Sequence, residues 1–461
     1  MKIAVLNGSP KGLTSVTMQY VAWLKKQFPE HQWNIHSVSQ RIGKLELDQK
    51  AWDELMGELE SADMILWGFP LYFLTVHSGY LRFIELLYER DARKILEGKP
   101  SAALSTSIHF YDHTAHNMIQ AVNDDLGLRF LGGHSAHMQD LFNRKARYVF
   151  TEIFRGWLQQ AEAAAPATLR AYAPVSYNVP NYKPGTPGKA AGTDNPGLKV
   201  TIVADPATEN LKAMIARMRH HFPQAEVMDL RTLQIGRCLG CMHCGPRNEC
   251  AYEKNAKDQF ASWFREKVLT ADIVIFAAPL KTRYLSSIWQ KYLERNFLRT
   301  HQPALSGKQT LFLVSGPLSQ EHNTQEVLRS YAEGMGAPVT ALISDEEEDS
   351  SRLDAALDQA AADLTRGAVE KIFRPDTFRG IGGKKLFRDE IFAGLKGLFQ
   401  ADNRYYKKSG YYDFPQKRRG MRFLSSLLIL LCHIPRIRKG MQKNMKNGMI
   451  MRYQKFLERK A

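Results

Sequence analysis

The chain has 461 residues, of which 44% are apolar and 10% aromatic, so it can form two or three domains that each bury a core. Its net charge of +16 comes from residues 371–461, which hold 23 Lys/Arg against 6 Asp/Glu, whereas the other residues hold 40 against 41. A body without basic excess excludes a nucleic-acid surface there, and the N-terminal residues lack a secretory signal, so we expect a cytoplasmic protein.

The first predicted strand, KIAVLN from Lys2, leads into a loop rich in hydrogen-bond donors. Residues 7–17 read NGSPKGLTSVT, and a helix follows them. The loop offers glycines for close backbone approach, hydroxyls and one cation: Gly8, Gly12, Ser9, Thr14, Ser15, Thr17 and Lys11. Phosphates bind where such donors converge at a helix N-terminus. The loop therefore predicts a phosphate site, the alternative being an ordinary capped helix.

Two further predicted strands end in loops suited to a flat ring. The strand MILWGF leads to PLYFLT (70–75), and the strand SAALSTS leads to IHFYDHT (108–114). Short apolar strands that alternate with helices indicate a parallel sheet, whose ligands lie at the carboxyl ends of the strands. His109, His113 and His116 are spaced loosely for a metal, but we favour packing against the ring or contact with substrate.

These motifs resemble the NADPH-dependent FMN reductase and iron–sulfur flavoprotein family, whose fold is flavodoxin-like. Residues 8–11, GSPK, resemble its phosphate-loop opening, and residues 70–72, PLY, resemble its flavin-ring loop. The resemblance implies NAD(P)H as electron donor and FMN as cofactor. It further implies that the FMN phosphate is held by Ser9, Lys11, Ser15 and Thr17, and the ring by Pro70, Leu71, Tyr72 and Phe73. From their place at the end of the strand SAALSTS, we expect Ser107 and His109 to form the opposite wall of the cofactor site.

The second half of the body repeats the first. ADMILWGFPL from Ala62 matches ADIVIFAAPL from Ala271 at an offset of 209, whereas the opening strands from Lys2 and Lys199 are offset by 197. The second copy therefore has twelve extra residues between these two strands. We predict an α/β protein with two tandem flavodoxin-like doubly wound parallel-sheet domains (1–170 and 198–370), an exposed Pro/Gly-rich linker (171–197) and a basic helical C-terminal tail (371–461).

The second copy lacks both flavin motifs. Its first strand leads to DPATEN (205–210), in which two carboxylates would repel a phosphate. Its ring loop, PLKTRY (279–284), has no aromatic residue directly after Leu280. We therefore expect FMN in the first copy alone.

The extra residues coincide with a cysteine segment, CLGCMHCGPRNEC (238–250). Two consecutive C-x2-C steps can wrap three thiolates around a corner, and the next cysteine can supply the fourth, so we favour a [4Fe-4S] cluster. Zinc and metal-free thiols are the alternatives. The spacing also resembles the compact motif of the iron–sulfur flavoproteins, which implies a fused dimer with the flavin in one copy and the cluster near it in the other. The expected ligands are Cys238, Cys241, Cys244 and Cys250.

The tail contains two predicted helices. Residues 389–399 carry apolar side chains on one face, and FLSSLLILLCHI (423–434) lies between basic clusters. Twelve apolar residues are too few to span a bilayer, which needs about 20. A basic, apolar helix can lie on an anionic membrane, and the alternative is packing on the body or on another subunit.

Together these observations predict an NAD(P)H-dependent flavin oxidoreductase that passes electrons from FMN to a [4Fe-4S] cluster and on to an acceptor that the sequence does not identify. The alternatives are an FMN-dependent quinone or nitro reductase with zinc or no metal at the cysteines, and a membrane-associated scaffold without catalytic activity. The expected partners are a nicotinamide nucleotide, the acceptor, an anionic membrane surface and a second copy of the chain, with no nucleic acid.

Overall fold

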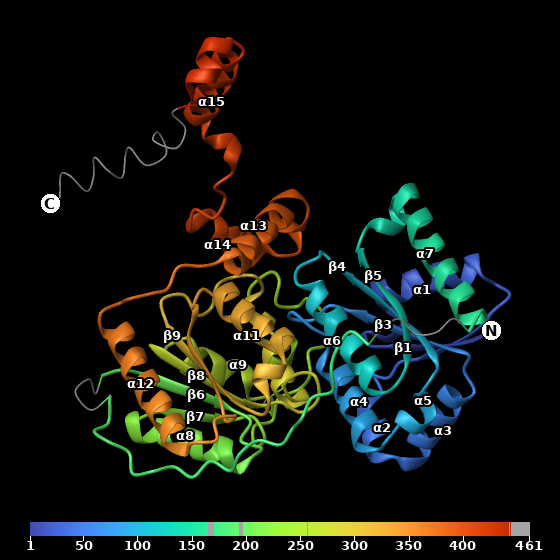
Figure 1. The fold of residues 1–461 in the computed structure, drawn as a ribbon, viewed down its shortest axis with the longest axis horizontal. Helices are drawn as coiled ribbons and strands as arrows, with labels where there is room; N and C mark the ends of the chain where they lie inside the picture. Colours follow the sequence, from blue (N-terminus) through green and yellow to red (C-terminus); the bar gives the residue numbers. More distant parts are fainter. Residues whose placement is uncertain (165–169, 193–196, 256, 442, 444–461) are drawn as a thin grey trace. The chain divides into compact units, whose positions relative to one another are not determined.

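The computed structural model describes residues 1–164, 170–192, 197–255, 257–441 and 443 (Figure 1). Residues 1–404 form one compact unit, and residues 405–461 form a second. The first unit contains two five-stranded parallel sheets with helices on their faces. The predicted fold class is confirmed, because two doubly wound α/β sheets are followed by a helical C-terminal region.

The first sheet has the strand order β2-β1-β3-β4-β5, which is the flavodoxin-like order. Its strands are β1 (Lys2–Asn7), β2 (Gln32–His36), β3 (Met64–Pro70), β4 (Pro100–Ser107) and β5 (Arg129–His137). Its helices are α1 (Val16–Gln27), α2 (Ile42–Leu47), α3 (Gln49–Glu60), α4 (Ser78–Glu89), α5 (Arg93–Leu96), α6 (Asp112–Asp125) and α7 (Arg144–Glu162).

Successive residues of the central strands enter different hydrophobic clusters, because side chains alternate across a sheet. Ile3 and Val5 of β1 pack with residues of α1 and α7. Ala4 and Leu6 belong to a second cluster that includes residues of α3, α4 and α6. Both faces of the sheet are therefore covered, which explains why its strands read as continuous apolar runs.

The second sheet repeats this order as β10-β9-β8-β6-β7. Its strands are β6 (Val200–Ala204), β7 (Glu226–Asp229), β8 (Ile273–Pro279), β9 (Gln309–Ser315) and β10 (Val339–Ser344). Its helices are α8 (Glu209–His221), α9 (Phe260–Trp263), α10 (Ser287–Arg295), α11 (His322–Gly334) and α12 (Ser350–Val369). The cysteine segment lies between β7 and α9, where the first domain has α2 and α3.

The two sheets share one hydrophobic cluster, and α4 packs against α10 at the interface. Glu294 of α10 accepts hydrogen bonds from the N–H and hydroxyl of Ser78 at 2.9 and 2.7 Å. Glu85 of α4 accepts the same pair from Ser287 at 2.6 and 2.8 Å. Each helix N-terminus is thus capped by a buried carboxylate of the other domain, and the two pairs differ by the 209-residue offset of the sequence repeat. Reciprocal contacts of this kind are typical of two-fold dimers, so the interface between the two domains has local pseudo-two-fold symmetry.

The segment between the domains has no helix or strand in residues 171–192 and is exposed over most of its described length. It is nevertheless attached to the second domain, since Tyr182 is buried and its N–H donates to Asn210 Oδ1 at 2.9 Å. The hydroxyl of Tyr182 also donates to Asp354 of α12 at 2.6 Å. The segment is therefore attached to the second domain at Tyr182, while most of its other described residues are exposed.

The C-terminal helices are α13 (Phe378–Ala393), α14 (Gln400–Lys408) and α15 (Arg419–Cys432). The helix expected over 389–399 instead ends at Ala393 and is followed by Gly394, a residue that disfavours helical backbone. α13 packs against α11 of the first unit, where Arg379 pairs with Glu326 at 2.6 Å. Residues up to 404 are thus part of the body, whereas α15 lies in the second unit.

Candidate cofactor site

The predicted phosphate loop leaves the carboxyl end of β1, which lies between β2 and β3 where the strand order reverses. The N–H of Gly8 donates to the carbonyl of Gly68 at 2.7 Å. A Cβ at Gly8 would lie 2.8 Å from the ring of Tyr80 and 2.9 Å from Phe69 Cβ. The loop can therefore follow this path only with glycine at position 8, unless the aromatic side chains move.

The predicted phosphate ligands keep hydrogen atoms to donate. Ser9 Oγ accepts the N–H of Lys11 at 3.2 Å, and Ser15 Oγ caps α1 by accepting the N–H of Met18 at 3.3 Å. A hydroxyl that accepts in this way retains its own O–H donor. The first amides of α1 also have no intrahelical acceptor. Donors of this number and kind at a helix N-terminus fit a phosphate monoester.

Thr17 differs from the other three predicted ligands. Its buried hydroxyl lies 2.7 Å from that of Thr106 at the end of β4. Only one of the two hydroxyls donates in this contact, so the other retains a hydrogen for a ligand. Thr17 therefore ties α1 to β4 in addition to any contact with a phosphate.

The predicted ring loop contains a tight turn at residues 72–75. The N–H of Tyr72 donates to the carbonyl of Thr75 at 2.7 Å, and the reverse bond measures 3.3 Å. Phe73 and Leu74 have φ of 50° and 70°, a region that costs about 1–2 kcal/mol for each residue with a Cβ. The burial of Leu74 helps to hold this conformation. Strained backbone of this kind is concentrated at binding sites.

Tyr72 connects this turn to the cysteine segment. Its ring meets that of His77 edge-on, with 5.1 Å between the centroids, and its hydroxyl lies against Gly240. His77 Nδ1 accepts the N–H of Gly79 at 3.1 Å, so Nε2 carries the proton and donates to the carbonyl of Cys238 at 2.9 Å. Burial lowers the pKa of His77 despite the nearby carboxylate of Glu294, which keeps the imidazole neutral.

All four cysteines line a cavity of about 190 Å³ together with residues of the first domain. The first domain contributes Lys11, Ser15, Pro70, Leu71, Tyr72 and Phe73, which are six of the ten residues predicted to hold FMN. The other four, Ser9, Thr17, Ser107 and His109, lie outside its lining. The cavity is smaller than the roughly 300–1,000 Å³ of typical ligand sites, because the cysteine segment lies against Tyr72.

The thiols are not arranged around a single ion. Across the described residues, no group of three or more His, Cys, Asp or Glu side chains is placed to hold one metal ion. Tetrahedral zinc with bonds of about 2.3 Å requires sulfurs about 3.8 Å apart. Each thiolate of a [4Fe-4S] cluster instead binds a different iron, so its sulfurs lie farther apart. In the described part of the chain there is thus no preformed zinc site, and no group placed to bind a cluster is evident either.

A buried cation lies beside the cysteines. Arg295 donates to Cys250 Sγ at 3.5 Å and forms two hydrogen bonds of 2.9 Å with Asp258. Burial raises the pKa of Cys244 to about 12 and raises that of Cys238 further, so these thiols are protonated at neutral pH without a metal. Positive charge next to sulfur favours the thiolate that a metal ligand must become.

The start of α14 holds the cysteine segment from outside. The N–H of Ala401 donates to the carbonyl of Gly245 at 3.1 Å, and Arg404 donates to the carbonyl of Pro246 at 2.6 Å. Between them the buried carboxylate of Asp402 accepts a hydrogen bond from the Thr300 hydroxyl and lies 2.8 Å from His301 Nδ1. The cysteine segment therefore depends on residues 401–404, which the sequence placed in a separate tail.

Ser107, the last residue of β4, and His109 in the loop that follows belong to a separate hydrogen-bond network. Ser107 Oγ accepts the N–H of His109 at 2.8 Å, and His109 Nδ1 lies 2.8 Å from Asp112. His116 instead bonds to Ser105 at 2.8 Å. His109 and His116 therefore have different side-chain partners.

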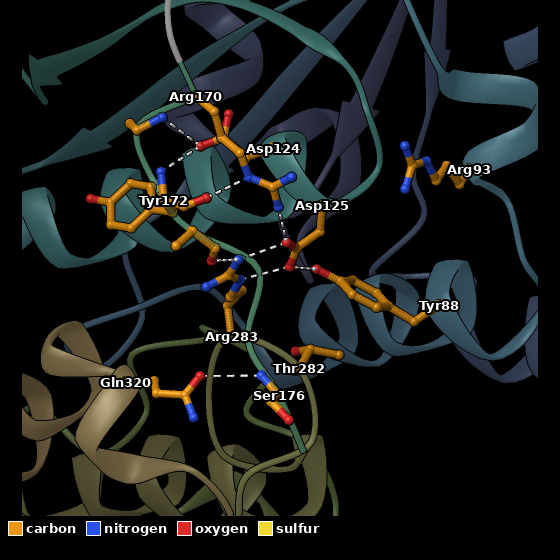
Figure 2. Close-up of polar contacts among 12 residues, drawn as sticks. Tyr88, Arg93, Asp124, Asp125, Arg170, Tyr172, Ser176, Thr282, Arg283 and Gln320 are labelled. Carbon is orange, nitrogen blue, oxygen red and sulfur yellow. Dashed lines mark hydrogen bonds and ion pairs between the residues drawn. The ribbon is translucent and has the colours of Figure 1, made fainter. Parts of the chain in front are cut away.

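The second copy uses its corresponding loops for other contacts. At the position of the phosphate loop, the buried carboxylate of Asp205 accepts from Arg231 at 2.6 Å and from the hydroxyl of Ser286. Figure 2 shows the ring-loop residue Arg283 bound to Asp125 of the first domain by two hydrogen bonds of 2.6 Å. Its neighbour Lys281 pairs with Glu89 at 2.6 Å. The ring loop of the second copy therefore joins the two domains. The buried carboxylate of Asp205 would repel a phosphate at the position of the phosphate loop.

The interdomain segment completes this junction. Arg170 also donates to Asp125, at 2.8 Å, and the N–H of Ser176 donates to Gln320 at 3.1 Å (Figure 2). Tyr88 of α4 donates its hydroxyl to the same Asp125 carboxylate at 2.8 Å. Asp125 is therefore the acceptor at which both domains and the connecting segment meet.

The family comparison applies to the first domain. Residues 1–138 match the NADPH-dependent FMN reductase family. This FMN reductase match spans β1 to β5, including both predicted flavin loops, confirms the resemblance found in the sequence and supports an oxidoreductase. It does not include the cysteine segment. No curated protein sequence matches the chain.

Solved structures similar to this chain cover about a third of it. The general stress protein 14 of Treponema denticola in complex with FMN is 14% identical, with 35% of this chain and 98% of that chain covered and a TM-score of 0.27. An NAD(P)H:quinone oxidoreductase from Methanothermobacter marburgensis is 9% identical, with coverages of 36% and 98% and a TM-score of 0.27.

Sequence reasoning missed His77, Glu294 and Asp402. Glu294 accepts the N–H of Cys238 at 2.7 Å in addition to its bonds with Ser78. The sequence contains a signal for Glu294, because Ser78 and Glu85 recur as Ser287 and Glu294 at the 209-residue offset of the repeat. No comparable pattern marks Asp402, which lies about 150 residues beyond the cysteines.

Proposed function

We propose that this protein is an NAD(P)H-dependent flavoenzyme that holds FMN in its first domain and passes electrons to a [4Fe-4S] cluster on the cysteines of its second. The observation that carries the proposal is the single cavity lined by the four cysteines, the ring loop, Lys11 and Ser15. The family match over residues 1–138 supports the flavin part.

The residues present fit FMN best at its phosphate end. Ser9 and Ser15 retain O–H donors, Lys11 supplies a positive charge, and the N-terminus of α1 faces the loop. At the ring end, the strained turn at Phe73 and Leu74 presents Tyr72 to the cavity. These residues would bind and orient the cofactor and exclude water from its ring.

The cysteine segment fits the role of an electron-transfer partner through its position and its surroundings. Bound FMN supplies hydride acceptance and a bound cluster supplies one-electron transfer, which together would divide an electron pair between acceptors. Arg295 beside Cys250 and Lys11 in the same cavity would offset the negative charge of four thiolates. His77 and Glu294 hold the backbone of Cys238 against the ring loop.

A second candidate is an FMN-dependent quinone or nitro reductase without metal at the cysteines. It is favoured by the absence, within the described part of the chain, of any group arranged to hold a metal ion. In this case the protonated thiols and Tyr72 would form one wall of the pocket for an organic acceptor. The two candidates share the flavin and differ at the cysteines.

Paired variants separate the two candidates. Ser9→Ala with Thr17→Ala should release FMN, because the phosphate loses hydroxyl donors in a buried turn, whereas Thr14→Ala should retain it, since that exposed hydroxyl donates to the carbonyl of Lys11. Cys244→Ser should remove iron and sulfide and leave FMN bound, with Cys432→Ser as the matched control. Unchanged FMN in the Ser9/Thr17 variant would contradict the flavin assignment.

Activity with the Cys244→Ser protein then decides the route of the electrons. The electron-transfer proposal requires that this variant keep NAD(P)H-dependent reduction of its flavin and lose transfer to a one-electron acceptor. Full quinone turnover in Cys244→Ser, with an iron-free wild type, would instead establish the plain reductase.

A further inference from the structure

The second unit contains an apolar helix, α15 (Arg419–Cys432), whose side chains are exposed along its length. Nine large apolar residues between 421 and 434 are each at least 38% exposed: Met421, Phe423, Leu424, Leu427, Leu428, Ile429, Leu430, Leu431 and Ile434. In α10 of the body, by contrast, Trp289 and Leu293 are completely buried. An exposed apolar surface of this extent marks an interaction site.

The apolar side chains surround the helix. Five consecutive residues, 427–431, read LLILL, and five residues cover more than one complete turn of an α-helix. A groove or a flat protein surface covers one side of a helix and would leave the others in water. A lipid phase can enclose the whole circumference, which favours a bilayer over a protein partner.

The helix is too short to cross a bilayer. Its 14 residues span about 21 Å at 1.5 Å per residue, whereas the hydrocarbon layer is about 30 Å thick. Among the residues that the structure describes, no single helix has the length and hydropathy of a membrane span. Residues Arg419–Cys432 and Pro435–Met441 pass that test only as a pair bent by 115°. This geometry suits a helix that enters a membrane and returns on the same side.

The charges around α15 also place both of its ends on one side. Residues 417–441 contain seven basic residues and no Asp or Glu, with Lys417, Arg418, Arg419 and Arg422 before the apolar run and Arg436, Arg438 and Lys439 after it. Basic side chains stay at the headgroup level and are attracted by anionic lipid. Two basic ends are therefore compatible with insertion into one anionic leaflet.

One stripe near the start of the helix is polar. Arg418, Arg422, Ser425 and Ser426 line a shallow hollow with Pro415 and Met421, and Arg418 also pairs with Asp413 at 2.7 Å. Guanidinium and hydroxyl groups are good donors to phosphate oxygens. This stripe can face the headgroups while residues 427–431 enter the acyl region.

We propose that α15 inserts into the surface of an anionic phospholipid bilayer and attaches the protein there as a peripheral enzyme. Residues 427–431 would enter the acyl region of one leaflet, with the basic ends of the helix among the headgroups. Attachment would then have an electrostatic part that salt weakens and an apolar part that salt does not remove.

The test uses the full chain and vesicle flotation. Wild-type protein should float with phosphatidylcholine vesicles that contain phosphatidylglycerol, remain in solution with phosphatidylcholine alone, and stay partly bound at high salt. Leu428→Glu with Leu430→Glu should lower the bound fraction at least tenfold. Lys407→Gln with Lys408→Gln makes the same change in net charge outside α15 and should retain most of the binding. Equal losses in the two variants would show charge attraction alone and would overturn the proposal.

Hydrogen exchange on the same samples shows what covers the helix. Amides of residues 423–431 should become protected when anionic vesicles are added, and the Glu variant should show no such protection. Protection of these amides without vesicles would overturn the proposal. Protection that increases with protein concentration would show that a second copy of the chain covers α15. Protection that is independent of protein concentration would show that the body of the same chain covers it.

Discussion

Glu294→Gln is the substitution that most directly tests how the two domains and the cysteine segment are joined. Its carboxylate accepts the N–H and hydroxyl of Ser78 and the N–H of Cys238, at 2.7–2.9 Å. Glutamine replaces one oxygen with an amide that faces donors. The loss of a hydrogen bond to a charged group costs about 1.5–3 kcal/mol, and an unpaired buried donor adds about 1–3 kcal/mol. We therefore expect the free energy of unfolding to fall by about 2.5–6 kcal/mol.

Glu85→Gln is the matched control, because Glu85 makes the reciprocal pair of bonds with Ser287 but none with the cysteine segment. Urea denaturation should show similar losses of stability in both variants. Alkylation of metal-free protein, followed by mass spectrometry, should show Cys238 reacting about tenfold faster in Glu294→Gln alone, since 1.5 kcal/mol of lost local stability raises the open population about tenfold. Equal alkylation of Cys238 in the two variants would refute this role of Glu294.

Three further predictions concern the tail, a buried acid and the phosphate loop. A chain that ends at residue 376 should be cleaved by protease within residues 238–250 much faster than a chain that ends at residue 417. Only the longer chain retains the hydrogen bonds from α14 to Gly245 and Pro246. Equal cleavage of the two chains would show that α14 does not hold the cysteine segment. Burial raises the pKa of Glu321 to about 7, so the folded state keeps a proton that the unfolded state has lost above about pH 4.3, and stability falls as pH rises to about 7. Urea midpoints should show Glu321→Gln losing this dependence, which amounts to about 4 kcal/mol, and a variant with the wild-type slope would contradict it. Gly8→Ala should lower stability by about 1–3 kcal/mol because its Cβ would lie 2.8 Å from Tyr80, whereas Gly43→Ala, with nothing within 4 Å, should be neutral or stabilising in thermal unfolding.

The architecture could be predicted because it is encoded in local patterns. Apolar strands between helices and the 209-residue offset indicated two parallel sheets. The structure has two parallel sheets, and their strands follow equivalent orders. The loss of the flavin motifs from the second copy also had a physical basis, since Asp205 is a buried acid where the first copy has Gly8. Motifs of this kind act over a few residues, so a sequence can reveal them.

Contacts between distant segments could not be predicted in the same way. The sequence repeat relates Ser78 and Glu85 to Ser287 and Glu294, but only the folded interface shows that each glutamate caps the other domain's helix. The sequence shows that the second ring loop has Lys281 in place of an aromatic residue, but the roles of Lys281 and Arg283 in joining the domains depend on where Glu89 and Asp125 lie. The tail was separated from the body by its charge, although Asp402 is buried beside Thr300 and His301. Charge composition does not reveal which few side chains of a segment are buried.

The central proposal, one flavin and one cluster at a shared site, is tested most directly by an anaerobic absorption spectrum with FMN, iron, sulfide and zinc measured per chain. We predict one FMN, about four iron and about four sulfide per chain, with absorption of both cofactors. Replacement of Cys244 should remove the iron and sulfide and retain the FMN. Protein with FMN and stoichiometric zinc, with FMN and no metal, or with two FMN per chain would contradict the proposal.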